Sequence, residues 1–222
     1  MGDHVHNSLK LFFNLPQEKR TKKALLWLLE QHWQKKNGLA GGFRDKSQEA
    51  TYYDRACLML SAFCDREDIT IQPLWASDKL ISVPVNERLN FLGKIDRVDE
   101  RPDGLHIIDY KTSKEEREDP WQLAMYAVMA HRYWQKPVVE LSYHFLETGS
   151  WLPIPVNPAR ETATIAQVEQ IIQAMPHSSA KKDWQCADAD GCQHCDYLKE
   201  LGIDPLADND GFERPMNQPS YL

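Results

Sequence analysis

The chain has 222 residues, of which 42% are hydrophobic, and a formal net charge of −7 at pH 7. This length fits one domain with at most a small appendage, and the negative charge argues against a protein whose whole surface binds nucleic acid. No run of about 18 apolar residues occurs, and the N-terminus lacks the apolar stretch of a signal peptide, so we expect no membrane insertion and no secretion. Five cysteines do not make a secreted disulfide scaffold, which favours a cytoplasmic location.

The first part of the chain is predicted to be helical. Apolar residues recur at helical spacing in three successive segments, residues 5–13, 18–36 and 47–64. In the first segment the apolar face consists of Val5, Leu9, Phe12 and Phe13. Each segment therefore predicts a helix with one buried stripe.

Strands are expected next, at residues 69–75, 79–85, 91–98 and 105–111. Pro102 and Asp103 are strong turn formers, so the last two strands should form a hairpin. The consecutive residues Ile107 and Ile108 indicate a strand that is covered on both faces.

The remaining pattern alternates between helix and strand. Asp119 is expected to cap a helix that begins at Pro120 and ends near Trp134, with Gln122 completing a capping box. Strands at residues 138–145 and 151–156 and a helix at residues 158–175 follow. This order predicts an α/β (α+β) core with a small mixed sheet flanked by helices.

The hairpin carries the chemistry of the chain. A turn centred between Pro102 and Asp103 places Asp96 opposite Asp109, and Lys111 points to the same face because it lies two residues further on. Two carboxylates this close repel each other unless a cation lies between them. A divalent metal held by both, with an ammonium beside it, is an arrangement that cleaves phosphodiesters, although a register slip of one residue would separate the two carboxylates.

Four motifs in order resemble the RecB-type nucleases of the PD-(D/E)XK superfamily, of which the CRISPR-associated RecB-like exonucleases are a subset. They are G-x-x-x-H at residues 2–6, G-x-x-D-x-x-D at 93–99, D-Y-K-T at 109–112 and Q-x-x-x-Y at 122–126. The resemblance covers roughly residues 2–145. It implies a restriction-endonuclease-like fold and metal-dependent hydrolysis of DNA, with exonuclease action in DNA repair, recombination or defence, often beside or fused to a helicase.

The resemblance also implies roles for single residues. It makes His6, Asp96, Asp109 and the backbone carbonyl of Tyr110 ligands of Mg²⁺ or Mn²⁺. Lys111 would orient or activate the attacking water and offset charge in the transition state. The residues that would steady the site or the DNA from the following helix are Gln122 and Tyr126.

Several of these residues have simpler interpretations. His4 is a nearby competitor of His6, and either histidine could be structural. Gln122 could serve only as a capping residue, and Tyr126, one turn further on, could be a core residue. On the hairpin we expect Asp99 to be a turn residue, and Arg97, which points away from Asp96, to be structural.

The cysteines of the C-terminal part form a separate candidate site. Cys186 precedes Cys192 and Cys195 in a C-x-x-C-D-Y segment, where related nucleases carry an iron–sulfur cluster, but the usual trailing cysteine is absent. These three thiols could hold an iron–sulfur cluster or Zn²⁺. The predicted organisation is a nuclease domain at residues 1–178, a cysteine-bearing segment at 179–205 and a polar tail at 206–222.

Two rival functions remain open at this point. One is a non-catalytic DNA-binding or assembly module of a helicase–nuclease complex, which the negative charge and the incomplete cysteine pattern favour. The other is a zinc-binding interaction domain, which depends on the cysteine segment alone. The opposed carboxylates argue for the enzyme, because a purely structural module does not need them.

Overall fold

The computed structural model describes residues 1–66, 74–87, 89–113, 120–157 and 160–174. The chain divides into two units, Met1–Gln167 and Val168–Leu222, and the whole sheet belongs to the first. The predicted cysteine-bearing segment and polar tail, residues 179–222, lie outside the described residues, so the predicted boundary at residue 178 stays a prediction.

The first three helices form one layer of the first unit. Their apolar stripes meet in a core in which Val5, Leu9, Phe12 and Phe13 are all buried, as predicted. Thr21 and Asp45 cap the second and third helices by accepting hydrogen bonds from backbone N–H groups. The elements are α1 (Gly2–Phe13), α2 (Lys22–Lys35) and α3 (Lys46–Cys64), with short 3₁₀ turns at Gln17–Lys19 and Gly38–Gly41.

Five strands form one mixed sheet in the order β1-β2-β3-β4-β5. Strands β3 and β4 are parallel and all other neighbours are antiparallel, which confirms the predicted mixed sheet. The strands are β1 (Leu74–Pro84), β2 (Asn90–Arg101), β3 (Gly104–Lys111), β4 (Val138–Phe145) and β5 (Trp151–Ile154). The later helices are α5 (Pro120–Trp134), which connects β3 to β4, and α6 (Arg160–Ala174).

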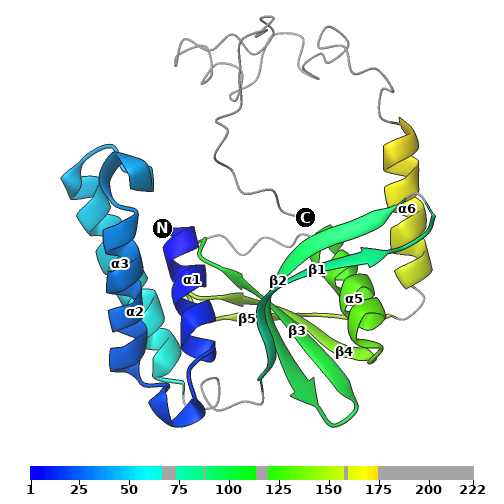
Figure 1. The fold of residues 1–222 in the computed structure, drawn as a ribbon, viewed down its shortest axis with the longest axis horizontal. Helices are drawn as coiled ribbons and strands as arrows, with labels where there is room; N and C mark the ends of the chain where they lie inside the picture. The colour runs from blue at the N-terminus through cyan, green and yellow to red at the C-terminus, as the bar shows by residue number, and fades with distance from the viewer. Residues whose placement is uncertain (67–73, 88, 114–119, 158–159, 175–222) are drawn as a thin grey trace, which may run out of the picture. The chain divides into compact units, whose positions relative to one another are not determined.

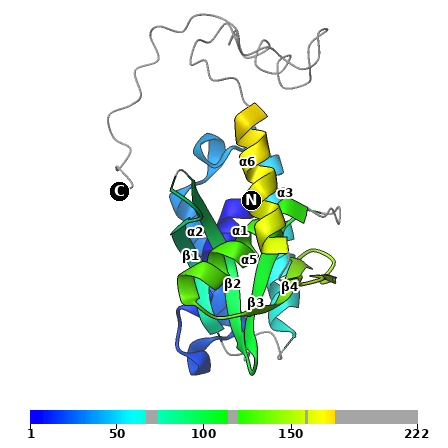
Figure 2. The ribbon, with the colours of Figure 1, turned by 90° about the vertical axis from the view of Figure 1, so that its right-hand side faces the viewer.

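Helices cover both faces of the central strands. The layer of α1, α2 and α3 lies on one side of the sheet, and α5 lies on the other (Figures 1 and 2). Ile108 and Tyr110 of β3 belong to the core beneath α1–α3, and α5 packs on β1 to β4. Ile107 and Ile108 are both fully buried, which confirms that β3 is a central strand.

The sheet differs from the expectation in two places. Two strands were expected at residues 69–75 and 79–85, whereas residues 74–84 form one strand, β1, because a bulge and the positive φ of Asp78 (49°) interrupt the pattern without ending the ladder. The rest of the first expected strand, residues 69–73, lies outside the described residues. Strand β2 continues beyond residue 98 to Arg101, so the turn contains only Pro102 and Asp103.

Candidate active site

The register of the β2–β3 hairpin brings the two predicted carboxylates together. The ladder runs from Arg101 opposite Gly104 to Arg97 opposite Ile108, and the next pair along is Asp96 and Asp109. At this pair the carboxylate of Asp96 accepts a hydrogen bond from the backbone N–H of Tyr110 (3.0 Å). The Asp96 side chain thus binds a backbone group where the two strands begin to separate.

Lys111 is held between the sheet and α5. Its Nζ lies 2.7 Å from Asp109 Oδ2 and donates a hydrogen bond to Gln122 Oε1 at 2.6 Å. The amide nitrogen of Gln122 lies 3.3 Å from the hydroxyl of Tyr126, one helical turn further along α5. The predicted residues Lys111, Gln122 and Tyr126 therefore form one chain of contacts that begins at Asp109.

His6 approaches the same carboxylates from α1. Its Nδ1 lies 3.1 Å from Asp96 Oδ1. Burial opposes protonation of this imidazole, but the hydrogen bond to Asp96 and the charges of Asp96 and Asp109 outweigh it and raise the pKa of His6. His4 points elsewhere, because its ring is buried against Trp33 with a centroid separation of 4.3 Å. Of the two competing histidines, only His6 contacts the hairpin carboxylates.

The surroundings of the Asp109 carboxyl group disfavour its ionised form. Burial and the neighbouring Asp96 raise its pKa to about 6, although Lys111 and His6 act in the opposite direction. The Lys111 ammonium, 2.7 Å from Asp109 Oδ2, does not outweigh burial and the charge of Asp96. A carboxylate that is buried and repelled by a like charge favours the approach of a further cation.

The donor set fits a hard divalent metal. Asp96 and Asp109 offer carboxylate oxygens, and the imidazole of His6 lies 3.1 Å from Asp96, which suits Mg²⁺ or Mn²⁺. Among the described residues, no three His, Cys, Asp or Glu side chains already converge as a closed metal cage. A cation here would complete its coordination with water or substrate, as an open catalytic site requires.

Two motif glycines allow both helices to come close to the hairpin. A Cβ atom on Gly2 would lie 3.3 Å from the hydroxyl oxygen of Thr112, directly after Lys111. A Cβ atom on Gly93 would lie 3.0 Å from Met129 of α5 and 3.3 Å from the ring of Tyr126. Larger side chains at these positions would push α1 and α5 away from the carboxylates.

The opposite face of the hairpin carries a different pair. Arg97 and Asp99 are almost completely buried, and the guanidinium donates two hydrogen bonds to the carboxylate at 2.6 and 2.9 Å. Arg97 also stacks on Phe13 of α1, 4.2 Å from the ring centroid. The structural role expected for Arg97 is confirmed, whereas the expectation that Asp99 is a turn residue is wrong. The spacing Arg97-x-Asp99 within one strand was the signal for this pair.

The predicted cysteine site cannot be described. Cys186, Cys192 and Cys195 lie outside the described residues. Cys57 and Cys64 of α3 are half-buried free thiols, and burial raises the pKa of both, to about 11 for Cys64. A raised pKa disfavours the thiolate that metal binding needs.

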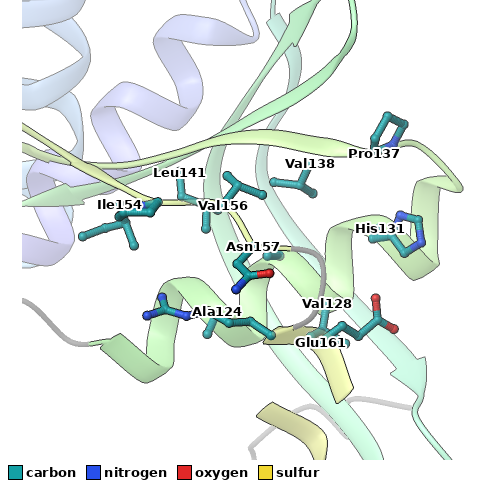
Figure 3. A pocket seen from close by; sticks show the side chains of 13 residues that line it. Ala124, Val128, His131, Pro137, Val138, Leu141, Ile154, Val156, Asn157 and Glu161 are labelled. Atoms are coloured by element: carbon teal, nitrogen blue, oxygen red, sulfur yellow. The ribbon is translucent and has the colours of Figure 1, made fainter. Parts of the chain in front are cut away.

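An apolar cavity of about 160 Å³ lies away from this cluster, between α5, β4 and the chain around β5 and the start of α6. Figure 3 shows Ala124 and Val128 of α5 facing Val138 and Leu141 of β4 across it. None of the hairpin carboxylates lines it, and it is smaller than ordinary ligand pockets of roughly 300 Å³ or more.

The helices in the described part of the chain include none long and apolar enough to cross a membrane.

Over residues 1–199 the sequence matches the family model described as the PD-(D/E)XK nuclease superfamily. This span contains every residue of the contact chain from His6 to Tyr126, together with the three cysteines at 186, 192 and 195. No curated protein matches the sequence.

Proposed function

The chain belongs to the PD-(D/E)XK nuclease superfamily, and from this premise we propose that it is a RecB-type, divalent-metal-dependent deoxyribonuclease that degrades DNA from its ends. The observation that carries the proposal is the opposition of Asp96 and Asp109 with Lys111 in contact. A buried carboxylate whose pKa is raised to about 6 by burial and a like charge supports a catalytic site over a non-catalytic module.

We assign the residues as follows. Asp96 and Asp109 would hold Mg²⁺ or Mn²⁺, with His6 and the carbonyl of Tyr110 as further ligands. Such a cation would polarise a phosphoryl oxygen and make water a better nucleophile. His6 also fixes the orientation of Asp96 through their contact of 3.1 Å.

Lys111 acts on the phosphate and the attacking water. Its ammonium lies 2.7 Å from Asp109, so it would lie close to a phosphate that binds to a metal held by the two aspartates. A fixed positive charge there stabilises the negative charge that develops on the phosphoryl oxygens. Gln122 can only accept from this ammonium through its carbonyl oxygen, so it holds Lys111 in place without removing its proton.

The cellular setting belongs to the same proposal. We place the protein in the cytoplasm, acting on DNA in repair, recombination or defence, with a helicase as partner or fused domain to supply separated strands. Cys186, Cys192 and Cys195 would hold an iron–sulfur cluster or Zn²⁺, and metal analysis of the purified protein separates these two.

The test is nucleotide release from end-labelled single- and double-stranded DNA with Mg²⁺ or Mn²⁺. Two matched variants of one hairpin sharpen it, Asp96→Asn in the carboxylate pair and Asp103→Asn in the exposed turn. We expect metal-dependent release from the wild type and Asp103→Asn, and loss in Asp96→Asn with DNA binding retained. A product series that shortens from one end establishes exonuclease action.

Other outcomes contradict the proposal in distinct ways. If folded wild-type protein binds DNA and cleaves nothing with either metal, the non-catalytic module becomes the better function. Internal cuts without end dependence would keep the nuclease and remove the exonuclease part. Equal activity of Asp96→Asn and Asp103→Asn would mean that the cleavage comes from elsewhere.

A further inference from the structure

A second set of charged contacts lies next to the carboxylate pair. Asp78 of β1 is buried, with 5% of its side chain exposed, and it pairs with two lysines. Lys10 Nζ lies 2.5 Å from Asp78 Oδ2, and Lys94 Nζ lies 2.5 Å from Asp78 Oδ1. These three residues come from α1, β1 and β2 and are called the Asp78 cluster below.

The Asp78 cluster is built from the same elements, α1 and β2, that carry His6 and Asp96. Lys10 is one helical turn after His6 on α1, and Lys94 is two residues before Asp96 on β2. The pairs Ser77–Arg97 and Lys79–Ile95 in the β1–β2 ladder place Asp78 opposite Asp96. A turn of helix and two residues of strand each span about 6 Å, so the two sets of contacts are neighbours.

The charges in the cluster do not cancel. One lysine would neutralise Asp78, and the second leaves a net charge of +1. The two lysine side chains remain 37% and 49% exposed, so their ammonium groups can reach a ligand while Asp78 holds them together. Asp78 Oδ2 has no aligned hydrogen-bond partner among the described residues.

The backbone at Asp78 is also unusual. Its φ of 49° lies in the left-handed region, which few residues other than glycine adopt. Such conformations persist where the surroundings hold them, often at ligand sites. The conformation turns the chain at the point where β1 passes the carboxylate pair, and there the Asp78 side chain reaches both lysines.

We propose that Lys10 and Lys94 bind one backbone phosphate of the DNA, next to the scissile phosphodiester, and that Asp78 is the positioning residue for both lysines. The proposal rests on the proposed nuclease function and adds a substrate-binding subsite to it. Lysine binds phosphate as a compact point charge. Two ammonium groups held close together can both contact the oxygens of one phosphate in the DNA backbone, where phosphates recur at even spacing.

The first test measures how salt weakens binding of a single-stranded oligonucleotide to the full chain in EDTA, so that no cleavage occurs. The variants are Lys10→Gln/Lys94→Gln and the control Lys22→Gln, whose lysine on α2 is similarly exposed (42%) and paired with Asp65. For single strands the slope of the logarithm of the binding constant against the logarithm of the salt concentration changes by about 0.7 for each phosphate contact. We expect the slope of the double variant to become shallower by about 0.7 and that of the control to stay unchanged.

The second test locates the phosphate. Methylphosphonate linkages, which carry no charge, are placed one at a time in an oligonucleotide, and binding to the wild type and the double variant is compared. We expect one linkage near the cleavage point to weaken binding to the wild type and to have no effect on the double variant. Single variants Lys10→Gln and Lys94→Gln, each showing part of the effect, serve if the double variant does not fold.

The outcomes separate this proposal from the nuclease assignment. An unchanged salt slope and an unchanged methylphosphonate profile overturn the subsite, and they also mean that the Asp78 cluster only ties α1 to the sheet. If wild-type protein cleaves no DNA but the salt dependence becomes shallower in the double variant, the contact of Lys10 and Lys94 with a DNA phosphate stands as a binding site, and the nuclease assignment fails.

Discussion

Two aspartates on one strand, Asp96 and Asp99, show how surroundings decide what a carboxylate does. Asp99 faces the α1–α3 layer and is matched one to one by Arg97 through two hydrogen bonds. Asp96 lies on the other face, opposite a second carboxylate, Asp109, and its contacts come from His6 and a backbone N–H. The first pair is complete within the protein, whereas the second still attracts positive charge.

The difference follows from the alternation of side chains along β2. Residues 97 and 99 point into the core, where an unmatched charge would be costly, so the ion pair is closed and stacked on Phe13. Residue 96 points to the face where β2 and β3 begin to separate. The same strand therefore presents a carboxylate closed in an ion pair and, three residues away, one that faces a second carboxylate.

The largest effect is expected for Asp109→Asn. Under the proposed function this change removes a metal ligand, and we expect nuclease activity to fall on the order of 10³-fold or more, about 4 kcal/mol in the activation barrier. Stability should move in the opposite direction. The pKa of Asp109 is raised to about 6, so its ionised form destabilises the folded protein at pH 7, and a neutral amide should relieve roughly 2 kcal/mol.

Urea unfolding at pH 7 and at pH 4.5 measures this stability effect. The folded protein protonates Asp109 as the pH falls through about 6, but the unfolded chain keeps this group ionised down to about pH 3.8, so at pH 4.5 the advantage of Asp109→Asn should shrink to roughly a third of its value at pH 7. A variant that is less stable than the wild type at pH 7 would mean that Asp109 is a structural residue like Asp99.

The matched change on the core face is Arg97→Met. Removing one partner leaves Asp99 buried and unpaired, and we expect a loss of about 3–5 kcal/mol of unfolding free energy. The double variant Arg97→Met/Asp99→Leu should recover most of this loss, because no buried charge remains. If Arg97→Met folds with wild-type stability but loses activity, the pair belongs to the site and the contrast between the two faces fails.

The buried residue His144 should make the folded protein less stable in acid. Burial and the charges of Arg66 and Arg97 lower the pKa of His144 to about 3. The unfolded chain binds a proton below pH 6.5 and the folded chain does not, so stability falls as the pH drops from 6.5 toward 3. Between pH 7 and pH 5 we expect a loss of roughly 2 kcal/mol from this group.

His144→Phe provides the comparison for that prediction. The wild type should lose about 2 kcal/mol more than His144→Phe over this pH range, whatever the stability difference between them at pH 7. Equal losses, measured by denaturant unfolding, would show that His144 is protonated in the folded state.

Much of this organisation was readable from the sequence. The hairpin register followed from the Pro102–Asp103 turn and from alternation, so the opposition of Asp96 and Asp109 could be predicted from local rules. The strongly periodic helices and the doubly covered strand β3 were also predictable, since their patterns are local. The family motifs added His6, which no local rule connects to a strand 90 residues away.

The rest depended on long-range packing. The interruption in β1 arises from the left-handed backbone of Asp78, and nothing in its neighbours specifies Lys10 and Lys94 as partners. Asp99 was misplaced because the polar residues that follow it resemble a turn, whereas its burial is decided by Arg97 and by the helix that packs above it.

Among changes on the face of the hairpin that carries Asp96 and Asp109, the smallest effect on activity is expected for Gln122→Leu. Gln122 contacts Lys111 and Tyr126, so under the proposed function it would be a positioning residue. Without it the ammonium keeps its charge and its contact with Asp109 but gains rotational freedom, and we expect kcat to fall about tenfold, or 1.4 kcal/mol. The apparent KM should change little, because the positive charge that faces the DNA is retained.

The alternative is that Gln122 only caps α5. In that case Gln122→Leu would lower the unfolding free energy by about 1 kcal/mol and leave kcat unchanged. Gln122→Glu separates these roles further. A carboxylate can also accept a hydrogen bond from Lys111, so it should restore part of the lost kcat. Partial recovery of kcat in Gln122→Glu, with unfolding unchanged in Gln122→Leu, would place Gln122 with Asp96 and Asp109, on the opposite side of the hairpin from Asp99.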